Sequence, residues 1–249
     1  MKDSNSHTIR GVYLLPNLFT TAGLFAAFYS IIAALGGRFE AAAIAIFIAM
    51  ITDALDGRVA RYTHTQTPFG AEYDSMSDMV SFGVAPALVA YSWALQNLGK
   101  LGWLAAFFYT AAAALRLARF NTQLETCSNK YFQGLPSPSA AAVVASMIWI
   151  GNAAPISNHI MSFFIAAVTV SMGALMVSNI KYYSFKEFDF KGRVPFVAIL
   201  AIVLVFVGIS LNPPIVLFST FTLYALSGPV HTLYRMQKVK RRRGTRKKS

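Results

Sequence analysis

Repeated apolar stretches of membrane-spanning length are the feature that most limits how this chain of 249 residues can fold. A helix needs about 20 mostly apolar residues to cross a bilayer. Eight stretches reach or approach that length, and turn-forming residues separate them. They are residues 15–36, 39–62, 73–97, 101–121, 137–155, 159–179, 194–211 and 213–234. We therefore expect an all-α, polytopic integral membrane protein with about eight transmembrane helices.

The composition supports this class. Only 13% of the residues are charged and 55% are hydrophobic, whereas soluble domains have about 25% charged residues. The single cysteine, Cys127, excludes an intramolecular disulfide. The first apolar run is too long for the core of a signal peptide, so we expect it to remain as a transmembrane helix.

The positions of the basic residues predict the topology. With a cytosolic N-terminus and eight spans, 20 Lys and Arg residues fall on the cytosolic side and only Arg38 and Lys100 on the other. This asymmetry follows the positive-inside rule and places both termini in the cytosol. Because topology accounts for the net charge of +12, we expect no nucleic-acid partner.

Three segments follow from this topology. We expect a cytosolic or interfacial segment at residues 1–14, a single transmembrane domain at 15–234 and a polybasic cytosolic tail at 235–249. The tail either attracts anionic membrane lipids or only anchors the topology.

Four aspartates cluster where the second apolar stretch ends and the third begins. Asp53 and Asp56 are spaced i, i+3, and Asp74 and Asp78 are spaced i, i+4, so each pair shares a helix face. Charged groups in spanning segments are costly and are usually functional. Hard cations such as Mg²⁺ prefer oxygen ligands, and two metals sharing carboxylates are typical of phosphoryl-transfer sites.

Small residues and an arginine accompany these acids. Gly57 and Ala60 lie four positions after Asp53 and Asp56, Arg61 follows directly, and Gly70 precedes the second pair. Small side chains leave room for a ligand near the backbone, and an arginine suits a phosphate. The structural alternative is a set of interfacial carboxylates paired with Arg58 and Arg61.

The pattern of eight fixed residues over 26 positions resembles, at every fixed position, the signature of the CDP-alcohol phosphotransferases. It reads Asp53-x2-Asp56-Gly57-x2-Ala60-Arg61-x8-Gly70-x3-Asp74-x3-Asp78. The resemblance implies a cytosol-facing site with two divalent cations, Mg²⁺ or Mn²⁺, in a protein that forms a homodimer. It also implies that an acceptor hydroxyl displaces CMP from a CDP-alcohol.

The same resemblance implies roles for individual residues. Asp53, Asp56, Asp74 and Asp78 correspond to the metal ligands, and Asp78 also corresponds to the catalytic base. The cytidine and diphosphate contacts correspond to Gly57, Ala60, Arg61 and Gly70.

Further segments resemble one branch of the family. Residues 15–20, 116–121 and 131–142 are similar to the integral-membrane phosphatidylserine synthases of bacteria and archaea. This implies CDP-diacylglycerol and L-serine as substrates, at a cytoplasmic membrane. Arg116 or Arg119 could hold the serine carboxylate, and Asn121 could accept from its ammonium group. Alternatively, these arginines only anchor the topology.

Two other functions remain open at this point. Another member of the same family would use glycerol 3-phosphate or an inositol phosphate as acceptor, and those phosphates should require a denser basic pocket. A carboxylate-based cation transporter would also place acids in a membrane. It would need them near the middle of the bilayer with a path to both faces, whereas the predicted cluster lies at one surface.

Overall fold

Helices make up almost all of the computed structural model, which describes residues 14–123, 131–152, 159–183 and 196–246. The α-helices are α2 (Leu14–Leu35), α3 (Phe39–Tyr62), α4 (Pro68–Asp78), α5 (Ala85–Trp93), α6 (Lys100–Gln123), α7 (Ser137–Gly151), α8 (His159–Val177), α9 (Phe196–Leu211) and α10 (Pro213–Arg246). Cys127 and residues 1–13 lie outside the described part of the chain. The expectation of a helical architecture is confirmed for the described residues, apart from two strands of three residues each.

Four of the described helices are long and apolar enough to cross a membrane. The candidate spans are Leu15–Leu35, Lys100–Thr122, Ile160–Val177 and Pro213–Thr232. The other predicted stretches are charged, bent or short: α3 carries the first pair of aspartates, and α7 has only 15 residues. Length and composition therefore indicate an integral membrane protein with several spans, and eight crossings remain a prediction.

The helices pack through small side chains. Ala27, Ala42, Ala43 and Ala140 are fully buried, and buried alanines let neighbouring helix backbones approach closely. Many large apolar side chains lie on the outside, as at Phe107, which is 63% exposed. Small buried side chains and exposed large apolar side chains suit contact with lipid, because hydrocarbon chains solvate apolar side chains well.

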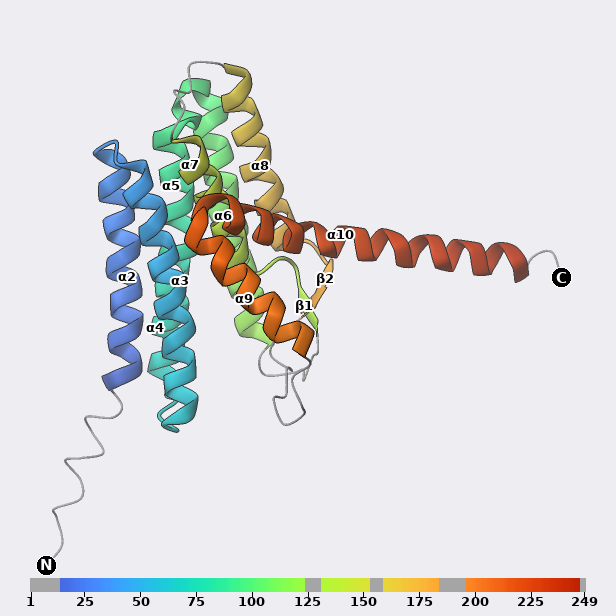
Figure 1. Ribbon diagram of the computed structural model, residues 1–249, viewed down its shortest axis with the longest axis horizontal. Coiled ribbons are helices and arrows are strands. Elements are labelled where there is room, and N and C mark those ends of the chain that lie inside the picture. Colours follow the sequence, from blue (N-terminus) through green and yellow to red (C-terminus); the bar gives the residue numbers. More distant parts are fainter. Residues whose placement is uncertain (1–13, 124–130, 153–158, 184–195, 247–249) are drawn as a thin grey trace, which may run out of the picture.

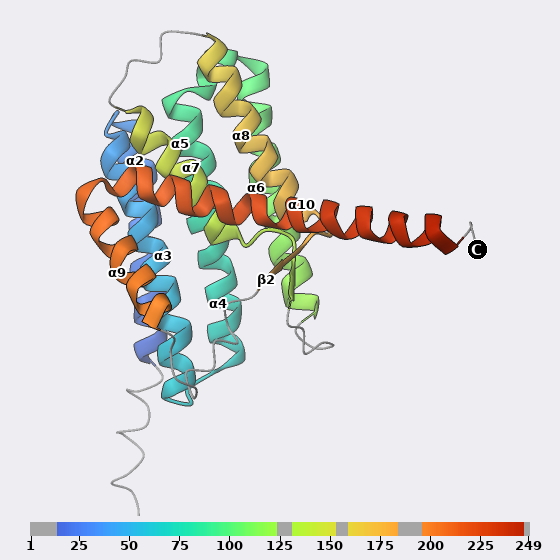
Figure 2. The same cartoon turned by 45° about the vertical axis from the view of Figure 1, so that its right-hand side comes forward.

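Figures 1 and 2 show α2, α3, α4 with α5, and α6 running side by side, whereas α10 lies across the bundle and projects away from it. The start of α2, the end of α3 and the start of α4 lie at one end of the bundle, and the C-terminal end of α6 points toward the same end (Figure 1). Residues distant in sequence therefore meet at this end.

The third predicted stretch is a bent helix. It begins at Pro68, where the Thr67 side chain caps the first turn by accepting from the Gly70 N–H at 3.0 Å. It then passes through a π-helical segment, η1 (Met79–Val84), before α5. In a π-helical segment the backbone hydrogen bonds join residues five apart. Tyr109 of α6 donates to the Phe82 carbonyl at 3.1 Å, and this bond holds α6 against the segment that follows Asp78.

Two short strands were not anticipated from the sequence. Strands β1 (Tyr131–Gln133) and β2 (Lys181–Tyr183) pair antiparallel, with Tyr131 opposite Tyr183. Gly134 follows β1 with a φ of 79°, and an added Cβ there would meet the Met176 carbonyl oxygen at 2.1 Å. This position therefore requires glycine, and the pairing connects the start of α7 with the end of α8.

The last helix is longer than its apolar part. It runs from Pro213 to Arg246, whereas the hydropathy pattern predicts an end near residue 234. Lys, Arg and Gln are good helix formers, so the backbone can stay helical where the apolar composition ends. The basic tail therefore starts within a helix.

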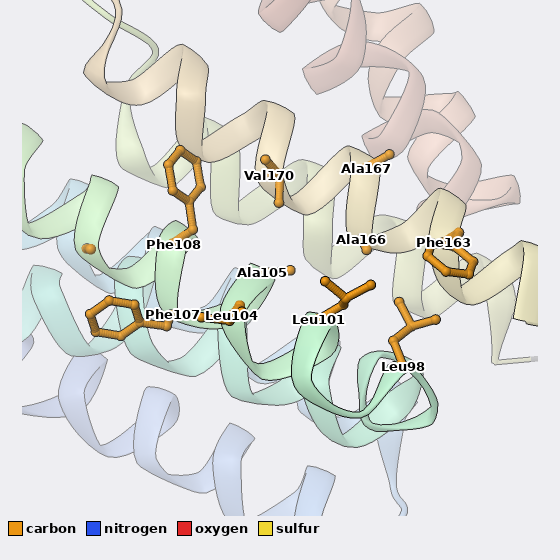
Figure 3. Close-up of a pocket in the computed structure, with 11 residues that line it drawn as sticks. Leu98, Leu101, Leu104, Ala105, Phe107, Phe108, Phe163, Ala166, Ala167 and Val170 are labelled. Carbon is orange, nitrogen blue, oxygen red and sulfur yellow. The ribbon is translucent and has the colours of Figure 1, made fainter.

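An apolar groove of about 650 Å³ lies between α6 and α8. Figure 3 shows Leu101, Phe108 and Phe163 along it. Its lining is apolar throughout, and Leu101 and Phe163 lie near the starts of their helices. The candidate acceptor residues lie at the opposite end of α6, so this groove is separate from the candidate site.

Candidate active site

Three aspartates from two helices converge at one end of the bundle. Asp53 and Asp56 come from α3 and Asp74 comes from α4, and each offers a carboxylate oxygen within 4.8 Å of the other two. The i, i+3 spacing puts the α3 pair on one face. Helix α2 packs against both α3 and α4, and this arrangement brings Asp74 close to the pair. Asp56 is buried, and Asp53 and Asp74 are half-buried. Together they could hold a metal ion.

Asp78 adjoins this group from the end of α4. Its carboxyl group lies within hydrogen-bond reach of Asp53 and interacts electrostatically with Asp74. The structure thus brings all four predicted acids together. Asp78 also interacts electrostatically with Arg116 of α6, so it is linked both to the acid cluster and to one of the candidate acceptor residues.

The cluster fits a bound cation. Asp74 Oδ1 is buried and has no hydrogen-bond partner, which is unfavourable for a carboxylate unless a positive charge faces it. Arg61 donates through Nε to the Gly57 carbonyl at 2.9 Å instead. Within the described ranges, neither Arg58 nor Arg61 forms an ion pair with these acids. This placement disfavours the alternative of simple arginine-paired carboxylates.

A hydroxyl group from α2 contacts one of the clustered aspartates. Thr20 is buried on α2, and its side chain lies 2.7 Å from Asp56 Oδ2 and 3.1 Å from the Pro16 carbonyl. Partners of this kind orient a metal ligand. Neither hydropathy nor motif spacing singles out Thr20, although a hydroxyl residue within an apolar helix is a weak signal.

Replacing Thr20 with valine is expected to weaken binding of Mn²⁺ by about tenfold, the lower end of the usual effect for residues that orient metal ligands. The valine keeps the shape of threonine but cannot donate to Asp56. Titration of detergent-purified protein with Mn²⁺, followed by electron paramagnetic resonance, measures this. Thr21→Val is the matched control, because Thr21 bonds Asn17 and Tyr73 instead. Equal affinities in the two variants would contradict the orienting role.

The predicted nucleotide contacts lie beside the acids. An added Cβ at Gly57 would meet nothing within 4 Å, so the surface next to Asp56 is open. Gly70 is enclosed: its added Cβ would lie 3.1 Å from Thr67 Oγ1 and 3.4 Å from Asn17 Oδ1. Ala60 is half-buried and Arg61 is exposed. Gly57 therefore leaves room for a ligand, whereas Gly70 also has a structural role at the start of α4.

The three predicted acceptor contacts have different surroundings. Arg116 donates to Ser137 Oγ at 2.7 Å, and its Nε is buried without a hydrogen-bond partner. Arg119 donates to the Val177 carbonyl at 3.2 Å and thus caps the end of α8. Asn121 donates to Ser75 Oγ at 3.0 Å. Of the three, Arg116 is therefore the one that interacts electrostatically with Asp78. Arg119 and Asn121 instead form hydrogen bonds that connect α6 with neighbouring helices.

Most of the chain matches a known protein family. Residues 13–178 match the sequence model of the family described as CDP-alcohol phosphatidyltransferase. Because this match covers more than half of the chain, the protein belongs to the CDP-alcohol phosphatidyltransferase family. The resemblance noted from the aspartate pattern is confirmed.

Individual relatives carry more specific names. The chain is 35% identical over 232 residues to a CDP-diacylglycerol–serine O-phosphatidyltransferase of Helicobacter pylori, covering 93% of this chain and 96% of the relative. It is 36% identical to an archaetidylserine synthase of Methanothermobacter thermautotrophicus over 72% of this chain and 73% of the relative. A CDP-diacylglycerol–serine O-phosphatidyltransferase of Methanocaldococcus jannaschii is 40% identical over 55% of this chain and 61% of the relative.

Proposed function

We propose that this protein is a CDP-diacylglycerol–serine O-phosphatidyltransferase, which transfers the phosphatidyl group of CDP-diacylglycerol to the hydroxyl of L-serine and releases CMP. The names of its relatives support this reaction, and one of them aligns with nearly the whole chain. The structural observation that carries the proposal is Arg116, whose guanidinium group interacts electrostatically with Asp78. A carboxylate-bearing acceptor can bind this arginine and present its hydroxyl group to Asp78.

The four aspartates would hold two divalent cations, Mg²⁺ or Mn²⁺, with Asp53, Asp56 and Asp74 providing the described cluster. Bound there, divalent cations neutralise phosphate charge and stabilise the leaving CMP. Gly57, Ala60, Arg61 and Gly70 would contact the cytidine diphosphate. Gly57 supplies the open surface, and the exposed Arg61 supplies a positive charge for a phosphate.

Asp78 acts as the general base. Its carboxylate removes the proton of the serine hydroxyl, and a base held within hydrogen-bond reach accelerates such a step by about 10²- to 10⁴-fold. The serine oxygen forms a bond to the phosphorus of the phosphatidyl group. The bond from that phosphorus to the CMP oxygen breaks, and CMP leaves with the electron pair. Arg116 holds the serine carboxylate and thereby orients its hydroxyl toward Asp78.

The surroundings of Asp78 favour serine over a phosphorylated acceptor. Among the described residues, Arg116 is the cation that interacts electrostatically with Asp78, and one guanidinium group matches one carboxylate. Glycerol 3-phosphate or an inositol phosphate carries more charge and would call for further cations. The acids also lie within the last ten residues of α3 and on α4, and the end of α3 and the start of α4 lie at one end of the bundle (Figure 1). This is not the arrangement of a transporter with a path to both faces.

We further propose that the acid end faces the cytosol, as the asymmetry of 20 to 2 basic residues indicates. Residues 15–234 would form one catalytic domain, with residues 1–14 and 235–249 on the cytosolic side. A homodimer is the expected assembly. CDP-diacylglycerol would reach the site laterally from the membrane, and serine would reach it from the cytosol.

The test is direct transfer by the purified protein. Protein in lipid nanodiscs is incubated with CDP-diacylglycerol, labelled L-serine and Mg²⁺ or Mn²⁺. We expect labelled phosphatidylserine and an equal amount of CMP, and no product once EDTA removes the metal. If labelled glycerol 3-phosphate is incorporated and serine is not, the proposed acceptor is wrong.

A further inference from the structure

The last helix reaches the acceptor side of the site. Tyr224 of α10 interacts electrostatically with Arg116, and Arg116 also donates to Ser137 at the start of α7. Helices α7 and α10 pack against each other. Arg116 therefore interacts electrostatically with Asp78 and also with Tyr224 and Tyr109. Helix α10 follows the region that matches the family model, which ends at residue 178.

One face of helix α10 packs against the buried core of the helical bundle. Leu217, Phe221 and Tyr224 pack against the buried core, and their spacing of four and then three residues puts them on one stripe of the helix. Leu223 and Leu226 point outward and are more than half exposed. The position of Tyr224 is therefore set by packing of the whole helix face.

Contacts with β2 fix this part of α10 further. The fully buried Tyr182 donates through its hydroxyl group to the Ala225 carbonyl at 2.9 Å. The rings of Tyr182 and Tyr224 pack in a tilted arrangement, with 5.7 Å between their centroids and 47° between their planes. One turn later, an added Cβ on Gly228 would lie 2.5 Å from the Tyr182 ring. The absence of a side chain at Gly228 therefore leaves space for the Tyr182 ring next to Tyr224.

We propose that Tyr224 is a second acceptor-binding residue, which donates a hydrogen bond to the carboxylate that Arg116 holds, and that the Tyr182–Gly228 contact sets its position. An arginine can only donate, whereas a phenol can accept from the guanidinium group and donate onward to an anion. A tyrosine beside an arginine thus adds a directional donor for a carboxylate. This inference rests on the proposed function, because it names the part of serine that is recognised.

Tyr224→Phe tests this with a minimal change. It keeps the ring that packs on Tyr182 and removes only the hydroxyl group. We expect the KM for serine to rise about tenfold, the usual effect of losing one hydrogen bond to a charged group, while the KM for CDP-diacylglycerol stays within twofold. Tyr234→Phe is the matched control, since Tyr234 lies on the same helix with its side chain 64% exposed, and it should leave both values unchanged.

Acceptor selectivity separates direct recognition from a structural role. Serinol has the amine and hydroxyl groups of serine but a hydroxymethyl group in place of the carboxylate. Tyr224→Phe should lower the ratio of kcat/KM for serine to that for serinol about tenfold. Gly228→Ala should lower the same ratio by displacing Tyr182, whereas Gly36→Ala, whose Cβ would meet nothing closer than 3.5 Å, should not.

The two hypotheses fail in different ways. If the wild-type protein transfers no phosphatidyl group to serine, the proposed function is wrong. If the wild-type protein uses serine but Tyr224→Phe keeps the serine KM and the serine-to-serinol ratio, only the role of Tyr224 is overturned. A parallel loss of activity toward serine and serinol would also overturn it, because that result indicates a role in packing alone.

Discussion

Asp78→Asn is expected to lower kcat about 10³-fold, within the usual range for removal of a general base, and to leave binding of CDP-diacylglycerol largely intact. The amide has the size of the carboxylate but cannot take the proton of the acceptor hydroxyl. Asp53, Asp56 and Asp74 would still be able to hold a metal ion, because their oxygens form the described cluster without Asp78. The defect should therefore appear in turnover more than in donor affinity.

Two measurements separate these effects. Release of CMP under saturating serine gives kcat, and calorimetric titration with CDP-diacylglycerol in nanodiscs gives donor affinity. Glu72→Gln is the matched control: Glu72 lies on the same helix, is exposed and stands outside the fixed positions of the motif, so this variant should retain full turnover. Turnover of Asp78→Asn at the wild-type rate would remove Asp78 as the base.

Arg116→Ala is expected to raise the KM for serine about 100-fold, since loss of a charge-assisted contact is worth about 2–3 kcal/mol. The guanidinium group is the partner that we assign to the serine carboxylate, and it also faces Asp78. Arg116→Lys should recover only part of the affinity, because an ammonium group keeps the charge but lacks the planar fork that binds a carboxylate with two bonds.

The neighbouring arginine provides the control for this prediction. Arg119 lies three residues further along α6, and it donates to the Val177 carbonyl and to Asn179 Oδ1. Arg119→Ala should therefore leave the serine KM within twofold of wild type and lower the melting temperature of the detergent-solubilised protein slightly. A larger effect on the serine KM from Arg119→Ala than from Arg116→Ala would reverse the assignment.

Much of the helical architecture could be predicted from the sequence because it depends on local patterns. Hydropathy placed the second helix at residues 39–62, and α3 runs from Phe39 to Tyr62. The i, i+3 and i, i+4 spacing of the aspartates put each pair on one helix face. The fixed positions of the motif predicted the family, and the match of residues 13–178 to the family model confirmed it.

The surroundings of each charged side chain could not be predicted in this way. Arg116 and Arg119 are both arginines near the end of one apolar helix, and nothing local distinguishes them. The structure separates them, because Arg116 turns toward Asp78 and Ser137 while Arg119 turns toward the end of α8. The bond from Thr20 to Asp56 likewise joins residues 36 positions apart.

Hydropathy, charge and motif spacing in the sequence determined the class of protein, the positions of its helices and the identity of its acids, because each depends on residues within a few turns of one another. Only the tertiary structure decided which arginine faces Asp78, that β1 pairs with β2, and that α10 crosses the bundle and brings Tyr224 to Arg116. Those features depend on contacts between residues far apart in the sequence, and such contacts leave no periodic pattern along the chain.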